Sequence, residues 1–146
     1  MGDRKGSPCG HNYGEYIMTT ELTMLVWSAV LGLVQIALAA TYSVSQRGLG
    51  WAASARDGVM PALTGVAARL DRARANFLET FPFFIAVVLA GCLLQRHSGM
   101  TVLGAQLYFW ARLAYVPVYA AGIPYLRTLI WAASIVGIVL LLTALF

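Results

Sequence analysis

The chain has 146 residues, which is the length of about one domain. Hydrophobic residues make up 60% of it and charged residues only 11%, with a mean hydropathy of +0.72. These values exclude an ordinary soluble domain and indicate a membrane protein. The net charge of +4 would suit nucleic acid or anionic lipid. The basic residues, however, cluster between apolar segments, as in proteins whose charges are sorted across a bilayer.

Four segments have the roughly 20 mostly apolar residues that a membrane-spanning helix needs. They cover residues 22–46, 76–95, 98–126 and 128–146. Within these ranges the only Asp, Glu, Lys or Arg residues are Glu79 and Arg112. An open sheet would leave backbone groups unpaired in lipid, so we expect helices. The prediction is an all-α integral membrane fold, a four-transmembrane-helix up-down bundle over residues 18–146. We expect its helices at about 20–46, 62–95, 100–121 and 124–145.

The segments outside the predicted helices are short. Residues 1–17 are polar and rich in glycine, which predicts a disordered or expression-derived leader. Cys9 and His11 are too few for a structural metal site, which needs about four ligands, so we predict no metal. Residues 48–61 carry turn-forming residues and are expected to be the longest connection.

The arginines differ in number between the two sides of the predicted bundle. One side carries Arg127 in the third connection and, around the first connection, residues 47, 56, 69, 72 and 74. The other side carries Arg96, with Arg4 and Lys5 near the N-terminus opposing the trend. The positive-inside rule therefore predicts that the arginine-rich side faces the cytoplasm and that both termini lie outside.

Polar residues form one stripe at the start of the second predicted helix. At about 100° per residue, Arg72, Asn76 and Glu79 fall within about 60° of one another, with Arg69 at the edge of the stripe. Arg74 points nearly the opposite way. Ionisable groups within membrane helices indicate functional sites by default, because burying them in lipid is costly.

The third predicted helix carries a matching face. Tyr108, Arg112, Tyr115 and Tyr119 follow one another at spacings of four, three and four. Counted from the turn that joins the two helices, Glu79 and Arg112 reach similar depths, so an ion pair between them is feasible. Pro82, three residues beyond Glu79, predicts a kink.

Two interpretations of these polar faces remain open. The charges could only pair and hold the bundle together, but pairing does not require so many arginines and tyrosines at one end. Arg127, Thr128 and Trp131, at the start of the fourth helix, add to the same end. A cationic excess with hydrogen-bonding tyrosines favours a site for an anion bearing carboxylates, which guanidinium groups bind in a bidentate manner.

Two sequence stretches resemble a known family. The stretch RARANFLETFPFF, residues 72–84, resembles the R-x-x-x-N-x-x-E-T signature of the MAPEG family, the membrane-associated proteins in eicosanoid and glutathione metabolism. The stretch RLAYVPVYAAGIPYLRT, residues 112–128, resembles the segment that joins the family's third and fourth helices. The resemblance covers nearly the whole chain after the leader and is strongest to the bacterial branch.

The resemblance implies a homotrimer that binds glutathione, as cosubstrate, between neighbouring subunits near the cytoplasmic side. It assigns the catalytic role, stabilisation of the glutathione thiolate, to Arg127. It assigns glutathione binding to Arg72, Asn76, Glu79, Arg112, Tyr115, Tyr119 and Thr128.

Some positions depart from the family's eukaryotic prostaglandin-synthase pattern. Ala75 replaces an arginine, Tyr115 occupies a position that can be histidine, and the spacing from Tyr119 to Arg127 is one residue shorter. These departures argue against prostaglandin-type isomerase chemistry.

The resemblance therefore implies a glutathione-dependent transferase or peroxidase that acts on lipophilic electrophiles or hydroperoxides in a bacterial inner membrane. The alternative is a non-catalytic membrane protein that binds lipid or glutathione, and a purely structural bundle is a third interpretation.

Overall fold

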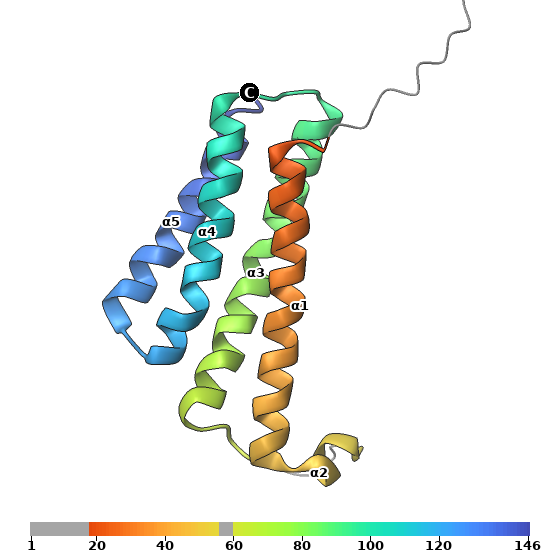
Figure 1. The fold of residues 1–146 in the computed structure, drawn as a ribbon, viewed down its shortest axis with the longest axis vertical. Coiled ribbons are helices and arrows are strands. Elements are labelled where there is room, and N and C mark those ends of the chain that lie inside the picture. Colours follow the sequence, from red (N-terminus) through yellow and green to blue (C-terminus); the bar gives the residue numbers. More distant parts are fainter. Residues whose placement is uncertain (1–17, 56–59) are drawn as a thin grey trace, which may run out of the picture.

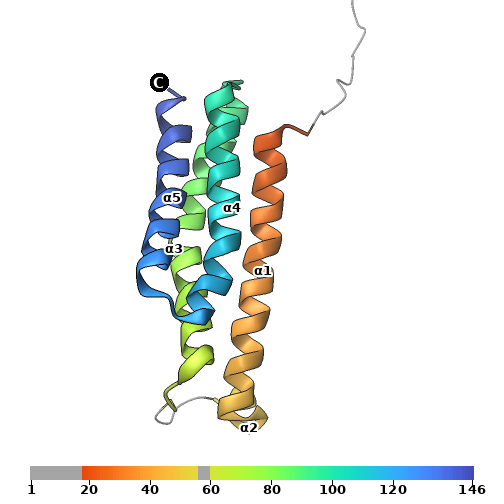
Figure 2. The same cartoon turned by 60° about the vertical axis from the view of Figure 1, so that its left-hand side comes forward.

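The computed structural model describes residues 18–55 and 60–146, and this part of the chain is all-helical. Its helices are α1 (Thr20–Arg47), α2 (Leu49–Ala53), α3 (Gly65–Leu93), α4 (Gly99–Ala121) and α5 (Pro124–Thr143). The four long helices stand side by side and alternate in direction, whereas α2 is a short helix at the lower end of α1 (Figure 1). The start of α1 and the C-terminus lie at the same end of the molecule (Figures 1 and 2). The proposed leader lies outside the described residues.

The first connection differs from the sequence expectation. Residues 48–61 were expected to be the longest connection, with no helix predicted there, but α2 occupies residues 49–53, and α3 begins at Gly65 instead of near residue 62. The cause is a tertiary contact. The Gln46 side chain accepts from the backbone nitrogen of Thr64 at 3.0 Å and donates to its carbonyl oxygen at 3.2 Å. Thr64 is thereby held extended, with φ −125° and ψ 164°, so the helix starts only at the next residue.

Helices α1, α3 and α5 are long and apolar enough to cross a membrane. Helix α4 is also long, at 23 residues, but its glutamine, arginine and tyrosines lower its apolarity. Most of those polar groups face the protein, because Arg112, Tyr108 and Tyr115 are buried, whereas Gln106 is exposed. Large apolar side chains instead lie outside: Leu33, Phe83 and Leu129 are 65–68% exposed. Small and polar residues inside with large apolar residues outside are the arrangement typical of membrane helices.

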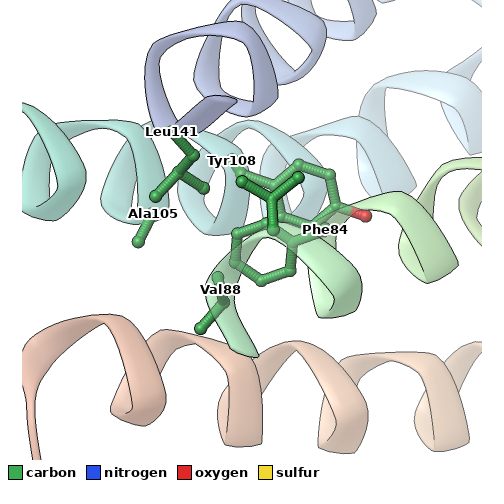
Figure 3. Packing of buried hydrophobic residues seen from close by; sticks show 6 residues of the cluster. Phe84, Val88, Ala105, Tyr108 and Leu141 are labelled. Carbon is green, nitrogen blue, oxygen red and sulfur yellow. The ribbon is translucent and has the colours of Figure 1, made fainter. Parts of the chain in front are cut away.

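The upper core joins α3, α4 and α5. The rings of Phe84 and Tyr108 stack with centroids 3.9 Å apart and an interplanar angle of 14°. Val88, Ala105 and Leu141 surround the stacked rings (Figure 3). Stacking at this distance brings α3 and α4 together and fixes Tyr108, whose hydroxyl lies 3.4 Å from the Thr80 hydroxyl of α3.

Helices α4 and α5 approach each other closely at two glycines. A Cβ atom on Gly104 would lie 2.8 Å from the carbonyl oxygen of Gly137, and one on Gly137 would lie 2.7 Å from the carbonyl oxygen of Gly104. No side chain fits such a gap without a shift of the backbone. The paired glycines therefore set the spacing of α4 and α5.

The turn between α4 and α5 is held by an arginine from α3. Gly122 ends α4 with φ 81°, in the left-handed region that favours glycine. The Arg69 guanidinium donates to the carbonyl oxygen of Ala120 at 3.0 Å and occupies the space that a side chain at Gly122 would need. A cation at the carboxyl end of a helix is favourable, because the unpaired carbonyl groups there carry partial negative charge. Arg69 therefore stabilises the fold at this turn.

Replacing Gly137 with alanine should lower the stability of the bundle by about 1–3 kcal/mol, because the new methyl group must push α4 and α5 apart. Thermal unfolding in detergent micelles measures the loss. Gly99→Ala is the matched control, since a Cβ there meets no atom within 4 Å. Equal unfolding midpoints for the two variants would contradict the close approach at Gly137.

Candidate functional site

Arg112 of α4 is the centre of a polar network in the lower half of the bundle. Its side chain is 1% exposed. One terminal nitrogen donates to Oδ1 of Asn76 at 2.8 Å and the other donates to Oγ1 of Thr80 at 2.6 Å. The rings of Tyr108 and Tyr115 lie 5.6 Å and 5.5 Å from the guanidinium carbon. The buried cation is thus held by two neutral oxygen atoms and two aromatic rings.

The expected ion pair between Glu79 and Arg112 does not form. Glu79 is exposed on α3 and makes no hydrogen bond or ion pair with a described residue. The reason is helix rotation. Asn76 and Thr80 are four residues apart and both face α4, whereas Glu79 lies about 100° around the helix from Thr80. Glu79 consequently forms no ion pair with Arg112.

Thr80 is a member of this network that the sequence analysis did not select. Its hydroxyl accepts from Arg112 and lies 3.4 Å from the Tyr108 hydroxyl and 3.2 Å from the carbonyl oxygen of Phe77. The four-residue spacing from Asn76 to Thr80 was the signal that could have revealed it. Thr80 also links the Arg112 network to the stacked rings of the upper core.

The contact with Arg112 fixes the orientation of Asn76. Because guanidinium can only donate hydrogen bonds, the Asn76 oxygen must face Arg112. The Asn76 amide nitrogen, with its two hydrogen atoms, then faces away from Arg112. Asn76 also lines a cavity, and the contact with Arg112 does not use its amide nitrogen.

This cavity of about 290 Å³ lies where α3, α4 and α5 meet near the arginine-rich end. Its lining residues are Asn76, Tyr115, Tyr119, Arg127, Thr128 and Trp131. Five of the eight residues selected from the sequence therefore line one cavity. The Thr128 hydroxyl donates to the carbonyl oxygen of Pro124 at 3.3 Å, a long bond within its own helix that leaves the oxygen able to accept another.

Two arginines converge on Tyr119. Arg72 Nε donates to the Tyr119 hydroxyl at 3.3 Å, and the guanidinium of Arg127 lies over the Tyr119 ring, 5.1 Å from its centroid. Neither arginine forms an ion pair with a described carboxylate. Arg72 is exposed and Arg127 is half-buried, so both keep donors free for an anion.

The remaining arginines of α3 lie apart from this cavity. Arg69 serves the α4–α5 turn, as described above. Arg74 forms an ion pair with Asp71 at 2.8 Å, on another face of α3. Residues 18–55 and 60–146 contain no group of three or more His, Cys, Asp or Glu side chains that could hold a metal ion. The side chains that line the cavity are those of arginine, tyrosine, asparagine, threonine and tryptophan.

Fold and site together define a helical membrane protein with an arginine- and tyrosine-lined cavity beside its third, fourth and fifth helices. Residues 24–146 match the model of the MAPEG family, so the chain belongs to that family. A search of the curated proteins found no match.

Substituting Thr80 with valine should cost about 1–3 kcal/mol of stability, because it leaves a buried guanidinium donor of Arg112 without an acceptor. The matched control is Thr41→Val, since the exposed Thr41 hydroxyl bonds only to the carbonyl oxygen of Ala37 in its own helix. Unfolding midpoints in detergent compare the two. A Thr80 variant as stable as the Thr41 variant would show that the Arg112 bond to Thr80 does not matter.

Proposed function

We propose that the protein is a glutathione-dependent transferase or peroxidase that acts on lipophilic electrophiles or hydroperoxides. The observation that carries this proposal is the convergence of Arg72 and Arg127 on Tyr119 at the edge of a cavity, with neither arginine neutralised by a described carboxylate. Membership in the MAPEG family supports glutathione as the anion.

The cavity has the donors that a peptide-like anion requires. Glutathione carries two carboxylates and one amino group, and guanidinium groups bind carboxylates in a bidentate manner. Asn76 offers its amide nitrogen, and Tyr115 and Tyr119 add aromatic faces and hydroxyl groups. Arg72 and Arg127 would bind the negative charges. Arg112 contributes through Asn76, whose orientation it fixes, rather than by touching the ligand.

The chemical step that we propose depends on thiolate formation. A thiol with a pKa near 8.5 is mostly protonated at neutral pH, and a neighbouring arginine lowers that pKa. In a transfer reaction, the sulfur bonds to an electrophilic carbon and the leaving group departs with its electron pair. In a peroxidase reaction, the sulfur attacks the peroxide and the O–O bond breaks, which yields an alcohol. A second glutathione then converts the oxidised sulfur to a disulfide and releases water.

We further propose that subunits assemble as a homotrimer, with glutathione bound between them. Arg72 and Glu79 are both exposed on α3 of the single subunit. An exposed charge on a membrane helix is costly in lipid, by several kcal/mol, so a second protein surface over this face would stabilise it. The site would then be half-built in each subunit and completed by the next.

The proposed location is a bacterial inner membrane, with α4 as the fourth spanning helix. Both termini would face the periplasm, because the arginine-rich end that holds the cavity would face the cytoplasm. Lipophilic substrates would then reach the cavity from the bilayer and glutathione from the cytoplasm.

The rival proposal is a non-catalytic protein that binds lipid or glutathione in the same cavity. The open side of the cavity beside exposed apolar residues suits a bound lipid as well as a substrate. Calorimetric binding of glutathione without product formation across a broad panel of electrophiles and hydroperoxides would favour this rival.

Replacing Arg127 with alanine should lower the turnover of glutathione with an aryl halide about tenfold or more, because each unit of thiol pKa changes the thiolate fraction about tenfold. Ultraviolet absorbance of bound thiolate provides a second measurement that should fall in parallel. Arg96→Ala, in the exposed α3–α4 turn, is the control. Full activity and full thiolate absorbance in the Arg127 variant would reject the assigned role.

Replacing Glu79 with glutamine should weaken glutathione binding about tenfold, the value of a charge-assisted hydrogen bond to the glutathione amino group. The stability of the unliganded subunit should not change, because Glu79 has no partner among the described residues. Asp71→Asn is the control on another face of α3, and calorimetry with glutathione compares them. Unchanged affinity in the Glu79 variant would remove this residue from the site.

A further inference from the structure

The α4–α5 turn has weak support from its own helices, although it leads directly to Arg127. Pro117 lies inside α4 and cannot donate a hydrogen bond to the carbonyl oxygen of Leu113, which weakens the last turn of that helix. Residues 121–126 are all exposed. Arg127 is the fourth residue of α5, and its backbone nitrogen donates to the carbonyl oxygen of Ile123 at 3.3 Å. The position of Arg127 therefore follows the position of the turn.

The carbonyl groups at the end of α4 show where outside support enters. The carbonyl oxygens of Val118 and Tyr119 accept from the backbone nitrogen of Gly122 at 3.2 Å and 3.1 Å. The carbonyl oxygen of Ala120 instead accepts from a terminal nitrogen of Arg69, at 3.0 Å. The α4–α5 turn lies beside the lower half of α3 (Figures 1 and 2). This single bond thus joins the turn to a helix 51 residues earlier in the chain.

The Arg69 side chain lies over the turn itself. A Cβ on Gly122 would overlap the Arg69 guanidinium, whose central carbon is 3.3 Å from that Cβ position. The hydrogen bonds of Arg69 go to backbone carbonyl oxygens, that of Ala120 and, at 3.4 Å, that of Gly65 in its own helix. Arg69 does not line the cavity that Arg127 lines. Arg69 therefore acts on the backbone of the turn, outside the proposed binding site.

Arg69 and Arg72 hold the end of α4 at two neighbouring points. They are three residues apart, so they share one face of α3. Arg72 Nε donates to the Tyr119 hydroxyl at 3.3 Å, while Arg69 holds the carbonyl group of the next residue. The Arg127 guanidinium lies over the Tyr119 ring, 5.1 Å from its centroid. The ring that Arg127 contacts is thus held at its hydroxyl and close to its backbone.

We propose that Arg69 is a positioning residue for Arg127, because its bond to Ala120 sets where the α4–α5 turn lies and so where Arg127 stands. This inference rests on the proposed function, in which Arg127 stabilises the glutathione thiolate. A displacement of about 1 Å at a catalytic group is enough to lower a rate strongly. Arg69 would therefore affect the reaction without touching the ligand, unlike Arg72, which would bind its charge.

The first test follows the turn directly and needs no glutathione. Hydrogen–deuterium exchange of the purified protein in detergent measures the backbone amides of residues 118–128. Arg69→Met removes the charge and the donors but keeps a long side chain. The amides of the turn should then exchange about fivefold faster, the effect of one lost hydrogen bond. Arg96→Met, in the exposed α3–α4 turn at the other end of the bundle, is the matched control and should leave these amides unchanged.

The second test measures turnover and thiolate absorbance at saturating glutathione with an aryl halide. Both should fall about tenfold in Arg69→Met, because Arg127 no longer stands beside the sulfur. Glutathione affinity should not change, because Arg69 does not line the cavity. Arg69→Lys keeps the charge and a donor, so it should recover most of the loss. Gly122→Ala should do less harm in the Arg69→Met background, where no guanidinium overlaps the new methyl group.

The outcomes separate this proposal from the proposed function. Unchanged exchange in Arg69→Met would overturn the positioning role even if turnover fell, because the lost charge and not a displaced turn would then be the cause. Faster exchange with full turnover and full thiolate absorbance would overturn it as well. Absence of both turnover and thiolate absorbance in the wild-type protein would reject the proposed function and the positioning role together.

Discussion

The structure depends on a buried arginine that has no acidic partner within the described chain. Arg112 is surrounded by Asn76, Thr80 and the rings of Tyr108 and Tyr115. A guanidinium removed from water loses several kcal/mol of hydration, and neutral oxygen atoms and aromatic rings recover only part of it. Each of these partners must therefore stay in place. The contact with Asn76 also orients a residue of the cavity lining, so the same bond supports both the fold and the cavity.

Packing above the site supports this arrangement. Phe84 stacks on Tyr108, and the Tyr108 hydroxyl lies 3.4 Å from Thr80, which holds Arg112. The close approach of Gly104 and Gly137 lets α5 lie against α4 and brings Arg127 over the Tyr119 ring. In a membrane the apolar exterior gives little drive for helix association, so close packing of small residues and internal hydrogen bonds must supply it. The site is a product of that packing.

Helical periodicity predicted much of the cavity lining from sequence alone. Spacings of three and four residues correctly placed Asn76, Arg112, Tyr115 and Tyr119 on facing helices, and the short turn brought Arg127 and Thr128 beside them. The expected partner of Arg112 was wrong, because depth and charge do not determine the rotation of α3 about its axis. Thr80 bonds to Arg112 instead, because its four-residue spacing from Asn76 places both residues on the side of α3 that faces α4. The later start of α3 could not be predicted, since it depends on Gln46 bonding to the backbone of Thr64, 18 residues away.

The distribution of acids explains why the cavity suits an anion. The carboxylate contacts of the described chain lie elsewhere: Arg74 forms an ion pair with Asp71 on another face of α3, and a ring nitrogen of His97 lies 3.4 Å from the buried Glu21 at the far end of the bundle. At the cavity, the neighbour that Arg72 and Arg127 share is Tyr119 and not a carboxylate. Tyrosine hydroxyls and rings orient guanidinium groups without cancelling their charge. In a low-dielectric site that uncancelled charge acts strongly, which supports the proposal of an anionic ligand.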